Sequence, residues 1–298
     1  MNSKVKGGII VENTAETVTY FIKGSNLKLD KCGLCLENKE LKNSHLMPKA
    51  LYKKLKGAFD GDDLVLNQSH DKSSVYTDFQ ITAHFLCAEC ESLFSRLGEN
   101  SVVSECHSGT DRFPLLHRVN EAKHFASIRG ERWFNPIKCE FPNTERYLYF
   151  AASIIWRASG WPVAKNANQK SLGVHYQEEF RRYLLGEQGF PKNAYLAVYV
   201  DSDEDIIPKI SFPTSSKKLG YHHHIFYIPG IKFSLVVGND VGEIRNLSSV
   251  ENTKVFFVSY SFKSHPDYQL MVGELMHEYK AKGRLALEKM YNNYDIKS

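Results

Sequence analysis

Several common signatures are missing from this chain of 298 residues. No stretch approaches 18 consecutive apolar residues, and the opening residues lack the long apolar run of a signal peptide. The chain has no glycine-rich phosphate loop of the Walker or dinucleotide type and no Gly-x-Ser-x-Gly element. The sequence therefore predicts a cytoplasmic protein that makes no membrane contact, and it gives no support to nucleotide-binding or serine-hydrolase chemistry.

Cysteine is scarce, but four of the six cysteines form two Cys-x-x-Cys pairs: Cys32, Cys35, Cys87 and Cys90. Thiolates at this spacing reach one Zn²⁺ at about 2.3 Å, and two such knuckles complete a tetrahedral site. Four sulfur ligands leave no open coordination position, so we expect a structural zinc. A redox pair is the alternative, but it leaves the second cysteine pair unexplained. Cys106 and Cys139 have no partner at metal spacing and are expected to be small buried residues.

Charge is almost balanced over the whole chain, at +4, but it is unevenly distributed. Residues 1–56 carry eleven lysines against five acidic residues. Such a face suits an anionic partner, although a solvated lysine-rich surface has the same composition.

The hydrophobic pattern predicts an α+β protein, with a small zinc module followed by a mixed helical and antiparallel-sheet domain. "ERYLYFAASIIWRASGW" predicts a buried helix that ends near Gly160, and "DYQLMVGELMHEYKAKGRLALEKMYNNY" a long C-terminal helix. The predicted divisions are an N-terminal β-hairpin over 1–28, a zinc-binding module over 29–105, a helical region over 106–192, and a β-rich region with the C-terminal helix over 193–298.

A histidine lies between the two cysteine pairs, in "SHLMPKALYK", and a glutamate directly follows the last cysteine of "CAECE". This order of Cys-x-x-Cys, His-x-x-Pro and Cys-x-x-Cys opening a helix resembles zinc-stapled HNH nucleases of the ββα-metal (treble-clef-like) type, over about residues 29–100. The resemblance implies a zinc-stabilised ββα module in which His45 is the general base against a DNA phosphodiester. It also implies that Glu91 holds a catalytic Mg²⁺ or Mn²⁺.

The chain departs from that family at three positions. Ser44 stands where the family has Asp or His, and a hydroxyl is a weak metal ligand. Glu91 replaces the usual histidine, and the asparagine that orients the base has no obvious counterpart, with Asn67 and His84 as candidates. Two functions therefore remain open: a metal-dependent endonuclease acting on DNA, and a catalytically inactive zinc-stapled module that binds nucleic acid or protein.

The chemistry of the enclosed segment is coherent in itself. Phosphodiester hydrolysis needs a proton acceptor near neutral pH, which a histidine provides, and a hard cation, which a carboxylate holds. Lysines around the histidine would contact phosphates, namely Lys42, Lys49, Lys53, Lys54 and Lys56.

Other features of the chain favour structural roles. In "YHHHIFY", His222 and His224 would share one face of a strand, which is too few ligands for a metal site. "IIWRASGW" indicates a domain interface or an aromatic and cationic recognition surface, and "DSDEDIIP" a solvated acidic turn. By analogy with HNH effectors of bacterial phage defence, the C-terminal region would sense a trigger or bind a protein partner.

Overall fold

The computed structural model describes residues 9–13, 16–20, 28–57, 64–68, 71–77, 80–108, 112–162, 170–206, 208–218, 220–265, 269 and 278–287. Within these residues the chain is an α+β protein, as predicted, with helices packed against mixed and antiparallel sheets. The expected N-terminal hairpin is present as strands β1 (Ile9–Asn13) and β2 (Glu16–Tyr20), which pair antiparallel.

The cysteine-bounded region forms a small sheet followed by a helix. We call this unit the cysteine module; it comprises β3 (Lys28–Lys31), β4 (Asn38–His45), β7 (Thr82–Cys87) and α2 (Ala88–Phe94). Both strand pairs are antiparallel, in the order β3-β4-β7. Three further elements lie between β4 and β7 in the sequence: α1 (Lys49–Gly57), β5 (Leu64–Gln68) and β6 (Ser73–Thr77).

Helix α2 does not stop at Phe94. It continues through a π-helical turn, η1 (Ser95–Glu99), into α3 (Asn100–Glu105), and the joining residues keep right-handed helical backbone angles. A π turn inside a helix is rare and is frequent at functional sites. This turn begins four residues after Glu91 and ends at Glu99.

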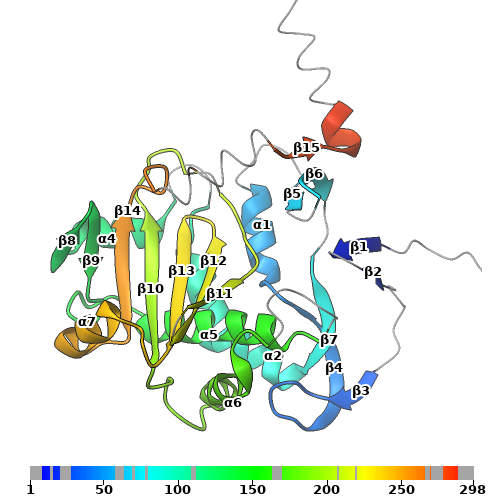
Figure 1. The fold of residues 1–298 in the computed structure, drawn as a ribbon, viewed down its shortest axis with the longest axis horizontal. Coiled ribbons are helices and arrows are strands. Elements are labelled where there is room, and N and C mark those ends of the chain that lie inside the picture. The colour runs from blue at the N-terminus through cyan, green and yellow to red at the C-terminus, as the bar shows by residue number, and fades with distance from the viewer. Residues whose placement is uncertain are drawn as a thin grey trace, which may run out of the picture.

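A seven-stranded sheet dominates the rest of the chain, in the order β11-β12-β13-β10-β14-β9-β8 (Figure 1). Adjacent strands of this sheet pair antiparallel, except that β10 and β14 pair parallel. Its strands are β8 (Ala126–Ile128), β9 (Glu131–Phe134), β10 (Ala194–Asp201), β11 (Thr214–Lys218), β12 (Tyr221–Ile228), β13 (Ile231–Gly238) and β14 (Val255–Tyr260). The helices of this part are α4 (Pro114–Glu121), α5 (Thr144–Gly160), α6 (Gly173–Leu184) and α7 (Glu243–Glu251).

Helix α5 is the centre of the molecule, because both of its sides are covered. It ends at Gly160, as predicted, and every residue from Tyr147 to Ser159 is buried. On one side, Tyr147 and Phe150 pack on sheet residues such as Phe233, at ring distances of 6.4 and 5.4 Å. On the other side, α5 contacts α2 and η1, which lie beside it in Figure 1. The helix thus joins the large sheet to the cysteine module.

Two predicted features are wrong in the described residues. The C-terminal segment is not one continuous helix, because Lys280 and Ala281 form strand β15 and pair parallel with β6; residues 267–268, 270–277 and 288–294 of that segment lie outside the described residues. The acidic turn is not fully solvated, since Asp201 is only 4% exposed. Its carboxylate accepts the backbone N–H groups of Asp203 and Phe262, and burial raises its pKa to about 7.

We expect Gly98→Ala to loosen the contact between η1 and α5. A Cβ on Gly98 would lie 3.1 Å from the backbone N and Cα of Phe150, and backbone atoms of a buried helix have little room to move. Overpacking of this kind outweighs the helix-propensity gain of alanine, so the free energy of unfolding should fall by about 1–2 kcal/mol. Urea denaturation measures the difference.

The matched control is Gly189→Ala, because a Cβ at Gly189 would meet no atom within 4 Å. Its effect should stay within about 0.5 kcal/mol. Equal stabilities for Gly98→Ala and the wild-type protein would show that η1 and α5 are not held at close approach.

Candidate functional site

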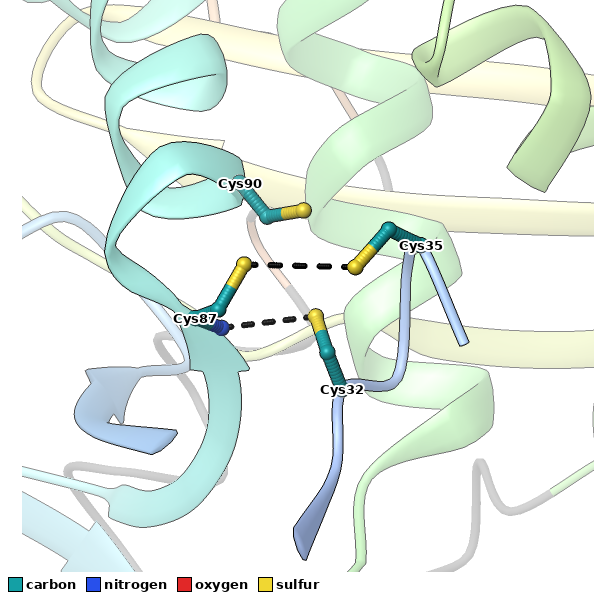
Figure 2. A group of neighbouring side chains, drawn as sticks. All are labelled: Cys32, Cys35, Cys87 and Cys90. Atoms are coloured by element: carbon teal, nitrogen blue, oxygen red, sulfur yellow. Dashed lines mark hydrogen bonds between the residues drawn. The ribbon is translucent and has the colours of Figure 1, made fainter. Parts of the chain in front are cut away.

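The four predicted cysteines converge on one point (Figure 2). Cys32 and Cys35 come from the turn after β3, Cys87 ends β7, and Cys90 lies in the first turn of α2. All four sulfurs lie within 4.8 Å of one another, and the Sγ atoms of Cys35 and Cys87 are 4.0 Å apart. Sulfurs on a tetrahedral zinc would be about 3.8 Å apart, given bonds of about 2.3 Å. The cluster can therefore hold one metal ion, and its geometry is consistent with structural zinc.

The first knuckle depends on a glycine. A Cβ at Gly33 would lie 2.1 Å from the ring of Phe85, so a larger residue would collide with that ring. The ring has no room to move away, since it stacks on Trp156 at 5.4 Å and meets Trp161 edge-on at 5.5 Å. Backbone hydrogen bonds close the turn: Cys32 donates to the carbonyl of Glu37, and Gly33 to that of Phe85.

Hydrogen bonds within the cluster favour the thiolate form of Cys32. The backbone N–H of Cys87 donates to the Sγ of Cys32 over 3.3 Å. A hydrogen bond from the Cys90 side chain lowers the pKa of Cys32 to about 4, whereas the same contact and burial raise the pKa of Cys90. Thiolate is the form that binds metal, so these contacts suit a metal centre.

Helix α6 braces the first knuckle from outside the module. Arg181 donates from Nη1 to the carbonyl of Leu34 over 2.9 Å, and its Nε lies 2.7 Å from a carboxylate oxygen of Glu178. We call the described residues from 112 to 265, which form the seven-stranded sheet and helices α4 to α7, the large domain. The knuckle backbone is therefore held by a residue of the large domain as well as by the cysteines.

His45 is the last residue of β4 and lies between the two cysteine pairs in the sequence. Its contacts differ from those of the cysteines. Burial, followed by the positive charge of Lys49, lowers the pKa of its imidazole, and a hydrogen bond between the ring and the Gln80 side chain opposes this shift in part. The ring is therefore neutral at neutral pH, the form that accepts a proton. Gln80 is a hydrogen-bond partner of His45 that the sequence did not reveal.

The two residues suggested as orienting partners of His45 are engaged elsewhere. Asn67 accepts a hydrogen bond from Ser74 in the hairpin of β5 and β6. His84 lies 3.3 Å from the carbonyl of Leu41 through its Nδ1.

Ser44 and Glu91 meet on the inner side of the module. Ser44 is 1% exposed, and its hydroxyl accepts the backbone N–H of Leu86 over 3.1 Å. Burial raises the pKa of Glu91, while hydrogen bonding from Ser44 and the charge of Arg157 lower it. Oε1 of Glu91 is buried and has no hydrogen-bond partner among the described residues. A helix-starting glutamate that only faced solvent would not be placed in this way.

Glu99 and Arg157 form a buried ion pair beside these residues, and sequence patterns did not single out Glu99. The Nη2 of Arg157 lies 2.6 Å from Oε1 of Glu99, and Nη1 donates to the backbone carbonyl of His45 over 2.9 Å. Both residues contribute to the electrostatic environment of His45 and of Glu91. Arg157 thus occupies the domain interface that "IIWRASGW" indicated.

The five predicted lysines differ in their contacts. Lys42 is paired with Glu40 at 2.8 Å, and the amino group of Lys54 donates to the carbonyl of Cys106 over 3.3 Å. Lys49, Lys53 and Lys56 are spaced along one face of α1, and Lys49 is the one whose charge reaches His45.

Among the residues that the structure describes, no second group of three or more His, Cys, Asp or Glu side chains brings its ligand atoms as close as the cysteines do. His222 and His224 stack at 6.3 Å on one face of β12, as expected, without a third ligand. Nor is any helix in the described ranges long and apolar enough to cross a membrane. Comparison with protein-family models, curated proteins and solved structures gives no match for the chain.

We expect purified protein to contain one tightly bound zinc ion per chain, measurable by elemental analysis. Cys87→Ser removes one ligand and should lower both the zinc content and the midpoint of thermal unfolding, because metal binding stabilises the folded state. Cys139→Ser is the matched control, since Cys139 lies outside the cluster. Wild-type protein without zinc, or a Cys87→Ser variant with unchanged stability, would contradict the assignment.

Proposed function

We propose that the cysteine-bound ion is a structural Zn²⁺ and that the chain is an HNH-like, metal-dependent endonuclease acting on DNA. One observation carries this proposal: His45, the last residue of β4, and Glu91, in the first turn of α2, share the Glu99–Arg157 pair as their electrostatic environment. A module built only for folding has no need of a neutral histidine and a half-buried carboxylate in that arrangement.

Each side chain has a defined task in this proposal. His45 takes a proton from the attacking water, and Gln80 holds the ring through its hydrogen bond. Glu91 would hold a Mg²⁺ or Mn²⁺ through its unpartnered oxygen, and such ions commonly bind through one or two carboxylates plus water and substrate phosphate. When bound, the ion would neutralise charge on the phosphate.

Lysines on α1 would meet the DNA backbone. Lys49 and Lys53 are exposed and lie one turn apart on the helix that follows the His-x-x-Pro segment. Phosphate contacts of this kind give affinity without sequence preference.

The second candidate function is an inactive module that binds nucleic acid or protein, and Ser44 favours it. The Ser44 hydroxyl is buried and accepts the Leu86 N–H, so it is poorly placed to be the second ligand of a catalytic ion. For a module of this kind, the cysteines and lysines would matter and His45 would not.

In this proposal, the part of the chain with the seven-stranded sheet recognises a trigger or a protein partner. This division of labour would make the chain an effector of a bacterial phage-defence system. Its support is analogy together with the packing of α5 and α6 on the cysteine module.

The nuclease proposal predicts that wild-type protein cleaves duplex DNA with Mg²⁺ or Mn²⁺. His45→Ala and Glu91→Gln should each lower the cleavage rate by at least about 100-fold, because they remove the proton acceptor and the ion-holding carboxylate. Agarose-gel conversion of supercoiled plasmid measures the rate, and zinc content and thermal unfolding verify that each variant is folded.

His84→Ala is the matched control, because His84 is an exposed histidine on the neighbouring strand β7. It should cleave like wild type. Equal behaviour of wild type and His45→Ala, in cleavage and in toxicity on overexpression in bacteria, would support the binding module instead.

The lowered pKa of His45 sets the expected pH dependence. Because burial and Lys49 shift it below the ordinary value of 6.5, the ring stays neutral, and so competent as a base, down to slightly acidic pH. The value of kcat/KM should therefore not fall between pH 8 and neutral pH, and the midpoint of its fall on the acid side should lie below pH 6.5. A steep rise between pH 7 and 9 would exclude His45 as the base.

A further inference from the structure

Arg157 is an unusual residue for its position. It lies in the most apolar helix of the chain, and its side chain is only 1% exposed. Removing a guanidinium from water costs several kcal/mol unless close partners compensate. The partners must therefore account for a buried guanidinium in the last turn of α5.

All donors of the guanidinium that have defined partners point toward the cysteine module or back into α5. Nη2 donates to Glu99 over 2.6 Å, and Nη1 donates to the carbonyl of His45 over 2.9 Å. Nε lies 3.4 Å from the carbonyl of Ser153, and the plane lies over the ring of Phe94 at 5.0 Å. The two short bonds connect α5 to the strand end that carries His45 and to the π turn that follows Glu91.

These bonds fix the end of β4 and the end of η1, neither of which carries a cysteine of the cluster. His45 is the last residue of β4, so its carbonyl marks the point where the strand leaves the sheet toward α1. Holding that carbonyl fixes the peptide plane next to the ring. Holding Glu99 fixes the far end of η1 against the same point. The planar fork of an arginine can serve both acceptors at once, whereas a lysine ammonium is a point charge.

We propose that Arg157 is the positioning residue of the active site, supplied by the large domain. It holds the main chain of His45 and the carboxylate of Glu99 in fixed relation, so residues 29–105 alone do not make a complete site. This inference rests on the proposed nuclease function. Arg157 does not touch substrate in this proposal and acts through the position of His45.

A purely structural arginine makes a different prediction. Its loss would lower stability, and the molecules that remain folded would cleave at the wild-type rate. Loss of a positioning residue lowers kcat in folded protein and leaves KM almost unchanged, because substrate contacts are retained.

The test uses the full-length, zinc-loaded protein and a DNA duplex with Mn²⁺. Arg157→Lys keeps the charge and loses the fork, and we expect kcat to fall by about 10- to 100-fold with KM within about twofold of wild type. In a His45→Ala background the same change should have no further effect on the rate. If Arg157→Lys does not fold, the same measurement is made on the double variant Arg157→Met with Glu99→Gln. This variant removes both buried charges together.

Arg181→Lys is the matched control. Arg181 also donates from a helix of the large domain to a backbone carbonyl of the cysteine module, and it also pairs with a glutamate, but its acceptor is Leu34. This variant should lose stability and keep the wild-type kcat.

The outcomes separate the two proposals. A His45→Ala variant that is inactive beside an Arg157→Lys variant with wild-type kcat overturns the positioning role and leaves the nuclease standing. Equal losses of kcat in Arg157→Lys and Arg181→Lys also overturn it. Wild-type protein that does not cleave, or that cleaves as His45→Ala does, overturns the nuclease proposal and the positioning role with it.

Discussion

The convergence of four cysteine sulfurs is the constraint on which the rest of this structure depends. It joins the turn after β3 to the junction of β7 and α2, which are more than fifty residues apart in the chain. The residues that follow each knuckle are therefore fixed relative to each other: His45 at the end of β4, and Glu91 in the first turn of α2. A small three-stranded sheet could not fix them alone, because it buries too little apolar surface for independent stability.

Side chains of the large domain also hold the cysteine module in place. Trp156 and Trp161 of the α5 segment enclose Phe85, and the close approach of Phe85 is the reason that the first knuckle needs Gly33. Arg181 braces the same knuckle, and Arg157 reaches the other side of the module at His45 and Glu99. Apolar contacts provide the area of this interface, and the two arginines define its alignment. The module and the sheet are thus parts of one packed unit in the described residues.

Local signals in the sequence were sufficient for the features that depend on spacing. The cysteine cluster follows from two Cys-x-x-Cys pairs, and α5 follows from a long apolar run that ends at Gly160. Strands β8 and β9 were not anticipated, because each is short and β9 owes its place to pairing with β14, more than a hundred residues later. The burial of Asp201 was missed for a similar reason, since one of its two partners is the distant Phe262.

The Glu99–Arg157 pair shows why the site could not be fully predicted. In an uninterrupted α-helix, residues eight apart such as Glu91 and Glu99 would lie about 80° apart around the axis. The π turn of η1 takes more residues per revolution and so brings Glu99 back toward the side of Glu91. No pattern in the sequence predicts that turn. In the sequence alone, Arg157, the partner of Glu99, is only a charged residue within an apolar helix.

We propose that the cysteine cluster and the His45–Glu91 site are two separate metal-related sites with different roles. Anomalous diffraction from crystals of the zinc-loaded protein soaked in Mn²⁺ tests this directly, because the two metals have distinct absorption edges. We expect a zinc peak at the four cysteines and a separate manganese peak at the Glu91 carboxylate, on the side of His45. A zinc peak at the cysteines with no manganese beside Glu91, in wild-type crystals at saturating Mn²⁺, would contradict it.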